Sequence, residues 1–324
     1  MAIADAARGV CGLGVIRVVR SDPRFAECTV GVHAGSGILV LRLVATGERP
    51  TQQPTMTEPT IRFDDGAAYE RYMGTWSQLA GETFLAWLGP KPGLRWLDVG
   101  CGNGAFTDLL FQRCAPAAVH GIDPSAAQLA FARTRGTSGS TSGSAQFHQG
   151  DATALPFADA SFDCVVMPLV IFFVPDPAKG VAEMARVVAP GGAVTAYSWD
   201  MEGGGFPYAV LLAEMRAMGI AVPHPPSPRA SRLDVLLELW TRAGLEHVET
   251  REIEVRRTFA DFDDYWTTIL GGPSVGGKLA AMGRGPLASL MQRMRAHLLP
   301  DAGGRITCAA RANAVRGRRP VRSA

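Results

Sequence analysis

The chain has 324 residues, of which 47% are hydrophobic, so it is long enough to bury one large core or two modest ones. Its formal net charge of +2 gives no strong field that would attract nucleic acid or a membrane surface. The 6 cysteines are scattered without a CxxC pair, which argues against a zinc site or a disulfide framework and favours a reducing cytoplasm. Since apolar runs of about 18 residues are missing, no membrane span is expected.

Residues 1–57 are expected to form an N-terminal extension that is poorly ordered or non-essential. The apolar run at residues 36–47 predicts a strand, but a polar stretch with two prolines follows it. Arg17 and Arg20 interrupt the earlier apolar stretch, which argues against a signal peptide. Met56 then begins a segment that has the composition of an ordinary protein start.

From residue 66 onward, helical and strand patterns alternate along the chain. Residues 66–88 carry apolar side chains, including Tyr69, Tyr72 and Trp76, at near-helical spacing. Short apolar runs ending in turn residues predict strands at 94–100, 117–125, 146–152, 162–170, 193–199, 246–255 and 304–317. Helical periodicity predicts helices at 103–114, 126–135, 177–188, 232–245, 259–272 and 287–298, and the Gly/Ser/Thr-rich segment 136–146 predicts a surface loop. This alternation favours a parallel sheet covered by helices.

The segment LRWLDVGCGNGAF, residues 94–106, contains the most informative local pattern. It places the carboxylate of Asp98 between an apolar run and the glycines Gly100, Gly102 and Gly104. Glycines allow the backbone to approach a ligand closely, and the following helix offers free N–H groups. Asp123 lies 19 residues after Gly104, at the end of the next predicted strand, where doubly wound folds bind ribose hydroxyls.

The charge of Asp98 helps to choose between ligands for this loop. The loop spacing is GxGxG, whereas the dinucleotide fingerprint is GxGxxG. A carboxylate at the loop would repel a pyrophosphate. S-adenosylmethionine (SAM) has no phosphate and carries a cationic ammonium and a cationic sulfonium, so charge alone favours SAM over NAD.

Four ordered segments carry a family resemblance. LDVGCGNG resembles motif I of the class I SAM-dependent methyltransferases, and GIDPS resembles their ribose-binding strand end. GDATALPFADASFDCVV is similar to their adenine-binding segment, and EMARVVAPGGAVTAYSW to the helix and strand that follow. The set covers roughly residues 66–200 and is most similar to the ubiquinone and menaquinone biosynthesis type of small-molecule methyltransferase. It implies an α/β, Rossmann-like, doubly wound fold with a seven-stranded, mostly parallel sheet and an antiparallel last strand, for which residues 304–315 are the expected segment.

The resemblance also implies a set of cofactor-binding residues and a division of the chain. The methionine end of SAM would be held by Asp98 and the backbone of Gly100, Cys101, Gly102, Asn103 and Gly104. The ribose and adenine would meet Asp123, Pro124, Asp151 and the Ala152 backbone, and the sulfonium would lie beside Met167 and Pro168. Residues 58–200 would form the SAM-binding core, 201–315 the acceptor-side helices and last two strands, and 316–324 a basic, solvated tail.

Structural alternatives remain open for several of these residues. Asp98 could be a helix cap, Asp123 part of a plain turn, and Asp151 a surface-loop acid. The aromatic residues of 66–88 could be a packing stripe or acceptor contacts. The segment 263–266 could be an ordinary amphipathic helix or a wall of the acceptor pocket.

Methyl transfer is an in-line displacement that requires alignment of the reactants and exclusion of water, with a base only where the acceptor loses a proton. Relatives often carry histidines after the fourth strand, whereas this chain has Ile171, Phe172 and Phe173. No catalytic residue or metal is therefore assigned. The phenylalanines suggest an apolar or aromatic small-molecule acceptor, with no nucleic-acid partner and an undetermined oligomeric state. The alternatives are a non-catalytic SAM-binding protein and an NAD-dependent dehydrogenase.

Overall fold

The computed structural model describes residues 17–18, 27–34, 37–44, 70–135, 145–222, 224–270, 272 and 275–321. The chain divides into two compact units, Met1–Thr57 and Glu58–Ala324. The first contains an antiparallel sheet in the order β1-β2-β3, with β1 at Arg17–Val18, β2 at Glu27–Ala34 and β3 at Gly37–Val44. β3 lies in the apolar run that predicted a strand. Whether this unit is dispensable stays a prediction, and most of the predicted 136–146 loop lies outside the described residues.

The second unit is built on a seven-stranded sheet with the order β6-β5-β4-β7-β8-β10-β9. Neighbouring strands from β6 to β8 are parallel, and β10 is antiparallel to both of its neighbours. This confirms the predicted doubly wound fold with an antiparallel last strand. The strands are β4 at Arg95–Val99, β5 at Ala118–Asp123, β6 at Gln146–Gln149, β7 at Phe162–Pro168, β8 at Val188–Trp199, β9 at Glu246–Phe259 and β10 at Ile306–Arg318.

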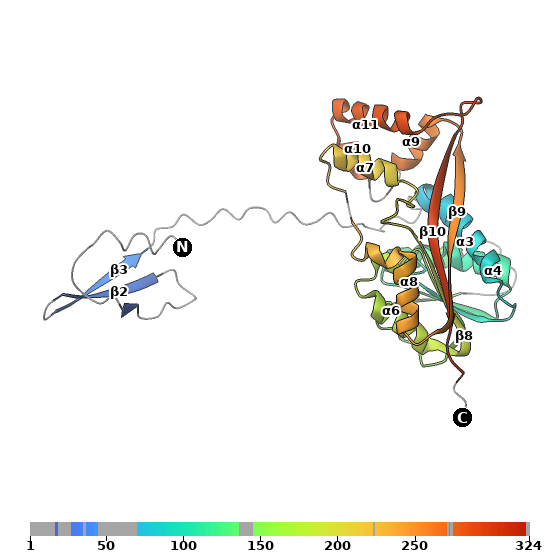
Figure 1. The fold of residues 1–324 in the computed structure, drawn as a ribbon, viewed down its shortest axis with the longest axis horizontal. Helices are drawn as coiled ribbons and strands as arrows, with labels where there is room; N and C mark the ends of the chain where they lie inside the picture. Colours follow the sequence, from blue (N-terminus) through green and yellow to red (C-terminus); the bar gives the residue numbers. More distant parts are fainter. Residues whose placement is uncertain are drawn as a thin grey trace. The chain divides into compact units, whose positions relative to one another are not determined.

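Helices cover both faces of this sheet, with α6 and α8 on one side and α3 and α4 on the other (Figure 1). A π-helical turn, η2 (Glu70–Gly74), leads into α3 (Thr75–Leu88), followed by α4 (Ala105–Cys114), α5 (Ala126–Arg135), the 3-10 turn η3 (Ile171–Phe173) and α6 (Pro177–Val187). The C-terminal third adds α7 (Ala209–Ala217), the 3-10 turn η4 (Pro228–Ser231), α8 (Leu233–Arg242), α9 (Phe262–Leu270), α10 (Gly276–Ala281) and α11 (Arg284–His297). No element was predicted at α7 or α10. Both are short, and their first turns carry no side-chain cap in the described part of the chain.

The central strands are apolar on both faces because each face has its own core. In β4, Trp96 packs in one core, whereas Leu97 and Val99 pack in the other. Strands covered on both sides are near-continuous hydrophobic runs, and this makes β4 and β7 recognisable in the sequence.

The aromatic side chains at the start of α3 form a packing stripe, as one of the two interpretations predicted. Tyr72 and Trp76 are 2% and 0% exposed. The Tyr208 hydroxyl donates to the Tyr72 carbonyl at 2.8 Å and accepts from Trp76 Nε1 at 3.3 Å. This buried arrangement joins η2 and α3 to the segment that precedes α7. Tyr69 lies outside the described residues.

Helix α9 is likewise an ordinary amphipathic helix. Tyr265 and Trp266 are 2% and 6% exposed and belong to the core, whereas Asp264 accepts from the Ala260 N–H at 2.9 Å. None of these residues lines the cavity described below. The segment 263–266 therefore packs into the core and does not form a wall of this cavity.

The expectation of a solvated tail from residue 316 is wrong for its first residues. β10 continues to Arg318, and Arg316 donates to Glu249 Oε2 at 2.7 Å. Arg319 then donates to the carbonyls of Arg186 and Val188 at 2.7 and 2.6 Å. The basic composition suggested a solvated tail, but these arginines bind backbone and carboxylate oxygens at the sheet.

Two stacked histidines lie near the β6 edge of the sheet. His120 Nδ1 and His148 Nε2 are 3.0 Å apart, the rings are 5.3 Å apart, and both meet the edge of Phe157. Burial, together with the neighbouring His148, lowers the pKa of His120. The folded protein therefore binds a proton at His120 less readily than the unfolded chain does.

We expect His120 to make the protein less stable as the pH falls. A base whose pKa is lowered by folding binds more protons in the unfolded state, so stability rises with pH until the pH exceeds the unfolded value of about 6.5. Urea unfolding at pH 7.5 and 5.5 should show a smaller loss of stability on acidification for His120→Phe than for the wild type. Equal losses in the two proteins would contradict this assignment.

Candidate functional site

A cavity of about 330 Å³ opens where strands β4, β5 and β7 end. Open α/β sheets bind ligands at the carboxyl ends of their strands, and this volume lies within the range of small-molecule sites. Three loops line it: residues 100–103 after β4, 123–125 after β5 and 168–170 after β7. The remaining walls come from η2, α3, α4 and α5, together with Phe173 of η3 and Tyr197 of β8.

The first loop adopts a backbone that requires glycine. Gly100, Gly102 and Gly104 have φ angles of +74°, +53° and +81°. The N–H groups of Gly100 and Cys101 both donate to the Ile122 carbonyl, at 2.7 and 3.1 Å. A Cβ atom on Gly100 would lie 2.5 Å from Val170 Cγ2, so the absence of a side chain lets the loops after β4 and β7 touch.

Asp123 joins the loops after β4 and β5. Its Oδ2 accepts from the Gly102 N–H at 2.9 Å and its Oδ1 from the Ser125 N–H at 2.8 Å. The side chain is 9% exposed and lines the cavity beside Pro124. Burial raises its pKa, and the two N–H bonds oppose this effect. The plain-turn alternative accounts only for the bond to Ser125, because the bond to Gly102 fixes the glycine loop.

Asp98 lies behind the cavity wall and outside its lining. It is 0% exposed, and its Oδ2 accepts from Thr107 Oγ1 at 2.7 Å. Its Oδ1 has no hydrogen-bond partner among the described residues. Burial raises the pKa of Asp98 to about 7. The helix-cap alternative is wrong, since Asp98 bonds a hydroxyl and the N-cap of α4 is Gly104.

A polar cluster joins the N-terminal turn to the glycine loop. Glu70 Oε2 accepts from Asn103 Nδ2 at 3.0 Å and from Arg135 Nη2 at 2.5 Å, and Arg135 also reaches Asp108 at 3.4 Å. All four residues line the cavity. The sequence interpretation included Asn103 but missed the other three, since tertiary packing alone brings α5 and η2 to the loop.

Several predicted site residues lie away from the cavity lining. Asp151 is exposed and accepts from the backbone N–H and hydroxyl of Thr153 at 2.7 and 2.8 Å, and these bonds lower its pKa. Asp151 thus lies in an exposed turn, as expected if it is an acid of a surface loop. Met167 is 0% exposed in the core. The cavity lining contains neither of them, nor Gly104 or Ala152, so their cofactor contacts stay predictions.

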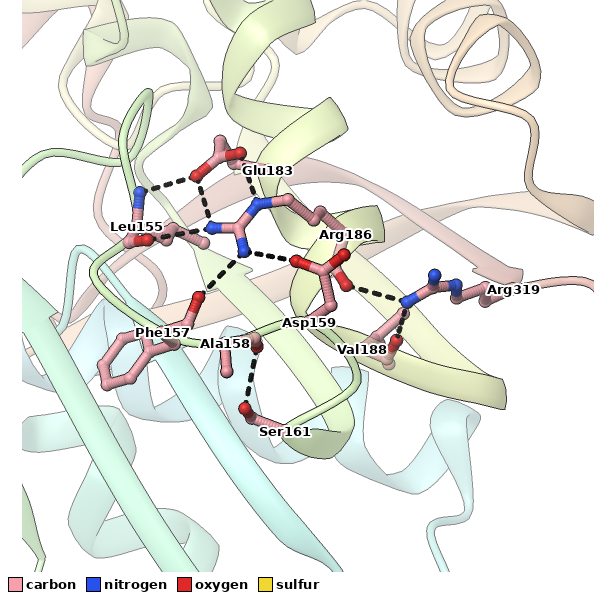
Figure 2. Close-up of polar contacts among 9 residues, drawn as sticks. All are labelled: Leu155, Phe157, Ala158, Asp159, Ser161, Glu183, Arg186, Val188 and Arg319. Carbon is pink, nitrogen blue, oxygen red and sulfur yellow. Dashed lines mark hydrogen bonds and ion pairs between the residues drawn. The ribbon is translucent and has the colours of Figure 1, made fainter.

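Arg186 fastens the loop between β6 and β7 to α6 (Figure 2). Its guanidinium donates to the carbonyls of Leu155 and Phe157 at 2.9 and 2.8 Å, and to carboxylate oxygens of Glu183 at 2.7 and 2.8 Å. It also donates to Asp159 at 2.8 Å. Hydrogen bonds to Glu183 and Asp159 raise the pKa of Arg186. The segment that resembles an adenine-binding loop is therefore held at its middle by one side chain.

The aromatic segment after β7 contributes less to the cavity than predicted. Ile171 and Phe172 are 0% and 3% exposed, pack in the two cores and do not line the cavity, whereas Phe173 does. Leu169, with φ of +60°, and Tyr197 complete this wall. No histidine lines the cavity within the described residues.

Within the described residues, no helix is long and apolar enough to cross a membrane. Among the same residues, no group of three or more His, Cys, Asp or Glu side chains is placed to hold a metal ion.

Comparisons with known proteins point to one family. A family profile described as "Methyltransferase domain" matches residues 97–196. An uncharacterized protein of Mycobacterium bovis is 31% identical over 160 residues, which is 46% of this chain and 57% of the relative. The demethylmenaquinone methyltransferase of Renibacterium salmoninarum is 38% identical over 105 residues, which is 32% of this chain and 41% of that enzyme. The chain thus spans 57% and 41% of the lengths of these two curated relatives.

Solved structures show the same fold at low identity. The YcgJ protein of Bacillus subtilis has a TM-score of 0.50 and 17% identity, over 75% of this chain and 99% of that one. Phosphoethanolamine N-methyltransferase 2 of Haemonchus contortus, solved with SAM, has a TM-score of 0.50 and 19% identity, over 88% of this chain and 63% of the other. Residues 97–196 therefore match a methyltransferase domain, and the sheet order agrees with the fold of these solved structures.

Proposed function

We propose that the chain binds SAM in the cavity beside the glycine loop and transfers its methyl group to a small-molecule acceptor. The observation that carries this proposal is the joined pair of loops, in which Asp123 holds Gly102 while facing the cavity. Relatives named as demethylmenaquinone methyltransferase and malonyl-[acyl-carrier protein] O-methyltransferase support this reaction class.

The residues present fit SAM better than a dinucleotide. A Cβ at Gly100 would collide with Val170, so the backbone itself forms the cavity wall at that point. Behind this wall, Asp98 has a buried carboxylate oxygen without a partner in the described part of the chain. A fully buried acid at this place favours a cationic ligand and opposes a pyrophosphate.

Within this proposal, binding is divided among the loops. The backbone of residues 100–103 would hold the methionine end, and Asp123 would accept from the ribose hydroxyls. Asp151 and Ala152 would reach the adenine only if the loop that Arg186 fastens moves or the ligand extends beyond the cavity. SAM supplies a methyl group bound to a sulfonium. When the acceptor takes the methyl group, the rest of the cofactor leaves readily as the neutral thioether S-adenosylhomocysteine. The protein then has to align the acceptor with that methyl group and exclude water.

The acceptor is proposed to be apolar or aromatic. The apolar and aromatic side chains in the cavity lining include Phe106, Leu109, Leu169, Phe173 and Tyr197. The titratable groups in the lining are mainly carboxylates, and its one arginine, Arg135, is paired with Glu70 and Asp108. A carboxylate or phosphate on the acceptor would therefore meet like charge. Turnover confined to small polar acceptors would contradict this part of the proposal.

Calorimetric titration of the full chain with SAM, S-adenosylhomocysteine (SAH) and NAD tests the proposal. SAM and SAH should bind and NAD should not. Asp123→Ala should weaken SAM binding by roughly tenfold to a hundredfold, since hydrogen bonds to charged groups contribute about 1.5–3 kcal/mol. Asp234→Ala is the matched control, because Asp234 is exposed, pairs with Arg232 and lies outside the cavity lining.

The alternatives give different results in the same assay. NAD binding, or no binding by the folded wild type, would overturn the assignment. SAM binding without turnover on a broad acceptor panel would indicate a non-catalytic SAM-binding protein.

A further inference from the structure

The carboxyl group of Asp98 is incompletely satisfied. It is 0% exposed on β4, and it accepts one hydrogen bond, from Thr107 on α4, at 2.7 Å. Oδ1 has no partner among the described residues. A buried carboxylate is costly unless it is paired with a cation or bonded at both oxygens. The carboxyl group of Asp98 can therefore either hold a proton or, when ionised, interact with a positively charged ligand.

Among the residues that the structure describes, the groups that act on Asp98 include no cation. Asp123 at the end of β5 adds like charge, and Thr107 on α4 adds a neutral hydroxyl. The Cys101 thiol in the loop is itself affected by Asp98, and burial raises its pKa. The register partner of Asp98 on β7 is Val166. Burial is the largest cause that raises the pKa of Asp98 to about 7, so protonated and ionised forms coexist near neutral pH.

The glycine loop that follows Asp98 along the chain forms part of the cavity wall. Gly100 follows Asp98 by two positions along the chain, lines the cavity, and has no side chain to interpose. Electrostatic interactions across such a buried layer are stronger than in water. A fixed positive charge in the cavity should therefore make Asp98 a stronger acid.

We propose that Asp98 is a specificity-determining proton site, which favours the sulfonium of SAM over the neutral thioether of SAH by releasing its proton when the cation binds. This inference rests on the proposed function. The carboxylic acid loses its proton to solvent, and the remaining carboxylate stabilises the sulfonium. SAH carries no sulfonium, so its binding leaves the proton of Asp98 nearly unchanged, and only the binding of SAM strengthens as the pH rises.

The expected number of protons released, and the expected pH dependence of the preference for SAM, follow from the linkage between proton binding and ligand binding. If the sulfonium strengthens the Asp98 acid tenfold, SAM binding at pH 7 releases about 0.4 proton more than SAH binding. Under the same assumption, the preference for SAM over SAH grows about fivefold between pH 6 and pH 8.

The test is calorimetric titration of the full chain with SAM and with SAH, in two buffers of different ionisation enthalpy, from pH 6 to pH 8. Wild type should release more protons with SAM, and Asp98→Asn should remove the Asp98 share of that difference. The amine of each ligand titrates equally in both proteins, so comparing them isolates Asp98. Thr107→Val should move the proton release to higher pH, because it removes the bond that lowers the pKa of Asp98.

The outcomes separate the two proposals. If Asp98→Asn retains the wild-type proton release, the inference is wrong. If that variant does not fold, Thr107→Val decides, and an unchanged pH profile overturns the inference. If the folded wild type binds neither SAM nor SAH, the proposed function fails first and the inference falls with it.

Discussion

Replacing Gly100 with alanine should reduce both stability and SAM binding sharply. Gly100 has φ of +74°, and an added Cβ would lie 2.5 and 2.6 Å from the two methyl groups of Val170. Left-handed backbone costs a side chain about 1–2 kcal/mol, and overpacking adds about 1–3 kcal/mol. Chemical denaturation should show a loss of about 2–5 kcal/mol, the sum of these two ranges. The added Cβ would push Val170 away from its place, and Val170 also lines the cavity. Calorimetry should therefore show at least tenfold weaker binding of SAM.

Gly93→Ala provides the matched control for Gly100→Ala. Gly93 has φ of +79°, and a Cβ there would meet nothing within 4 Å. The Gly93→Ala variant should lose only the free energy that left-handed backbone costs a side chain, about 1–2 kcal/mol, and should bind SAM normally. The double variant Gly100→Ala, Val170→Ala should recover part of the affinity by removing the collision. Equal effects at Gly93 and Gly100 would show that the close approach to Val170 is unimportant.

Arg186→Met should loosen the loop between β6 and β7. The change removes two hydrogen bonds to backbone carbonyls of that loop, in addition to the bonds to Glu183 and Asp159. The side chain is 32% exposed, which weakens its charge interactions, so the expected loss of about 2–4 kcal/mol rests on the hydrogen bonds. Hydrogen exchange should accelerate in residues 154–161 before it does so in the core strands.

Arg242→Met separates this effect from the loss of any salt bridge. Arg242 pairs with Glu238 on the surface of α8, with side chains 78% and 51% exposed. Exposed pairs of this type contribute at most about 0.5 kcal/mol. If both variants lose the same stability, or if exchange in 154–161 stays at the wild-type rate, Arg186 does not fasten the loop.

Local patterns in the sequence were sufficient for the sheet and the glycine loop. Strands buried on both faces are continuous apolar runs, and GxGxG with Asp123 19 residues later is a local spacing. The start of β8 was misjudged because the sequence predicted a helix to residue 188 and a strand only from residue 193, whereas β8 is Val188–Trp199. The structure continues the strand through residues 189–192 with a register shift, since Phe162 pairs with Val188 but Cys164 pairs with Ala193. Glycines here accommodate an irregular strand.

The rest of the site depends on packing between distant segments. Glu70 and Arg135 are 65 residues apart, and they meet at the cavity only after η2 and α5 have packed around the glycine loop. No spacing rule connects them. The burial of Asp98 likewise depends on the strands β5 and β7 that pair with β4 on either side. Its unpartnered oxygen within the described residues also depends on this packing.

The strand order has a consequence for how the chain is synthesised. β10 is the last strand in the sequence, yet it lies between β8 and β9 and hydrogen-bonds to both. Until the ribosome has released residues 306–318, β8 keeps an open edge and β9 has no partner in the described sheet. Open strand edges invite pairing with other chains. In the growing chain, the edge of β8 therefore stays open to such pairing until β10 emerges and lies between β8 and β9.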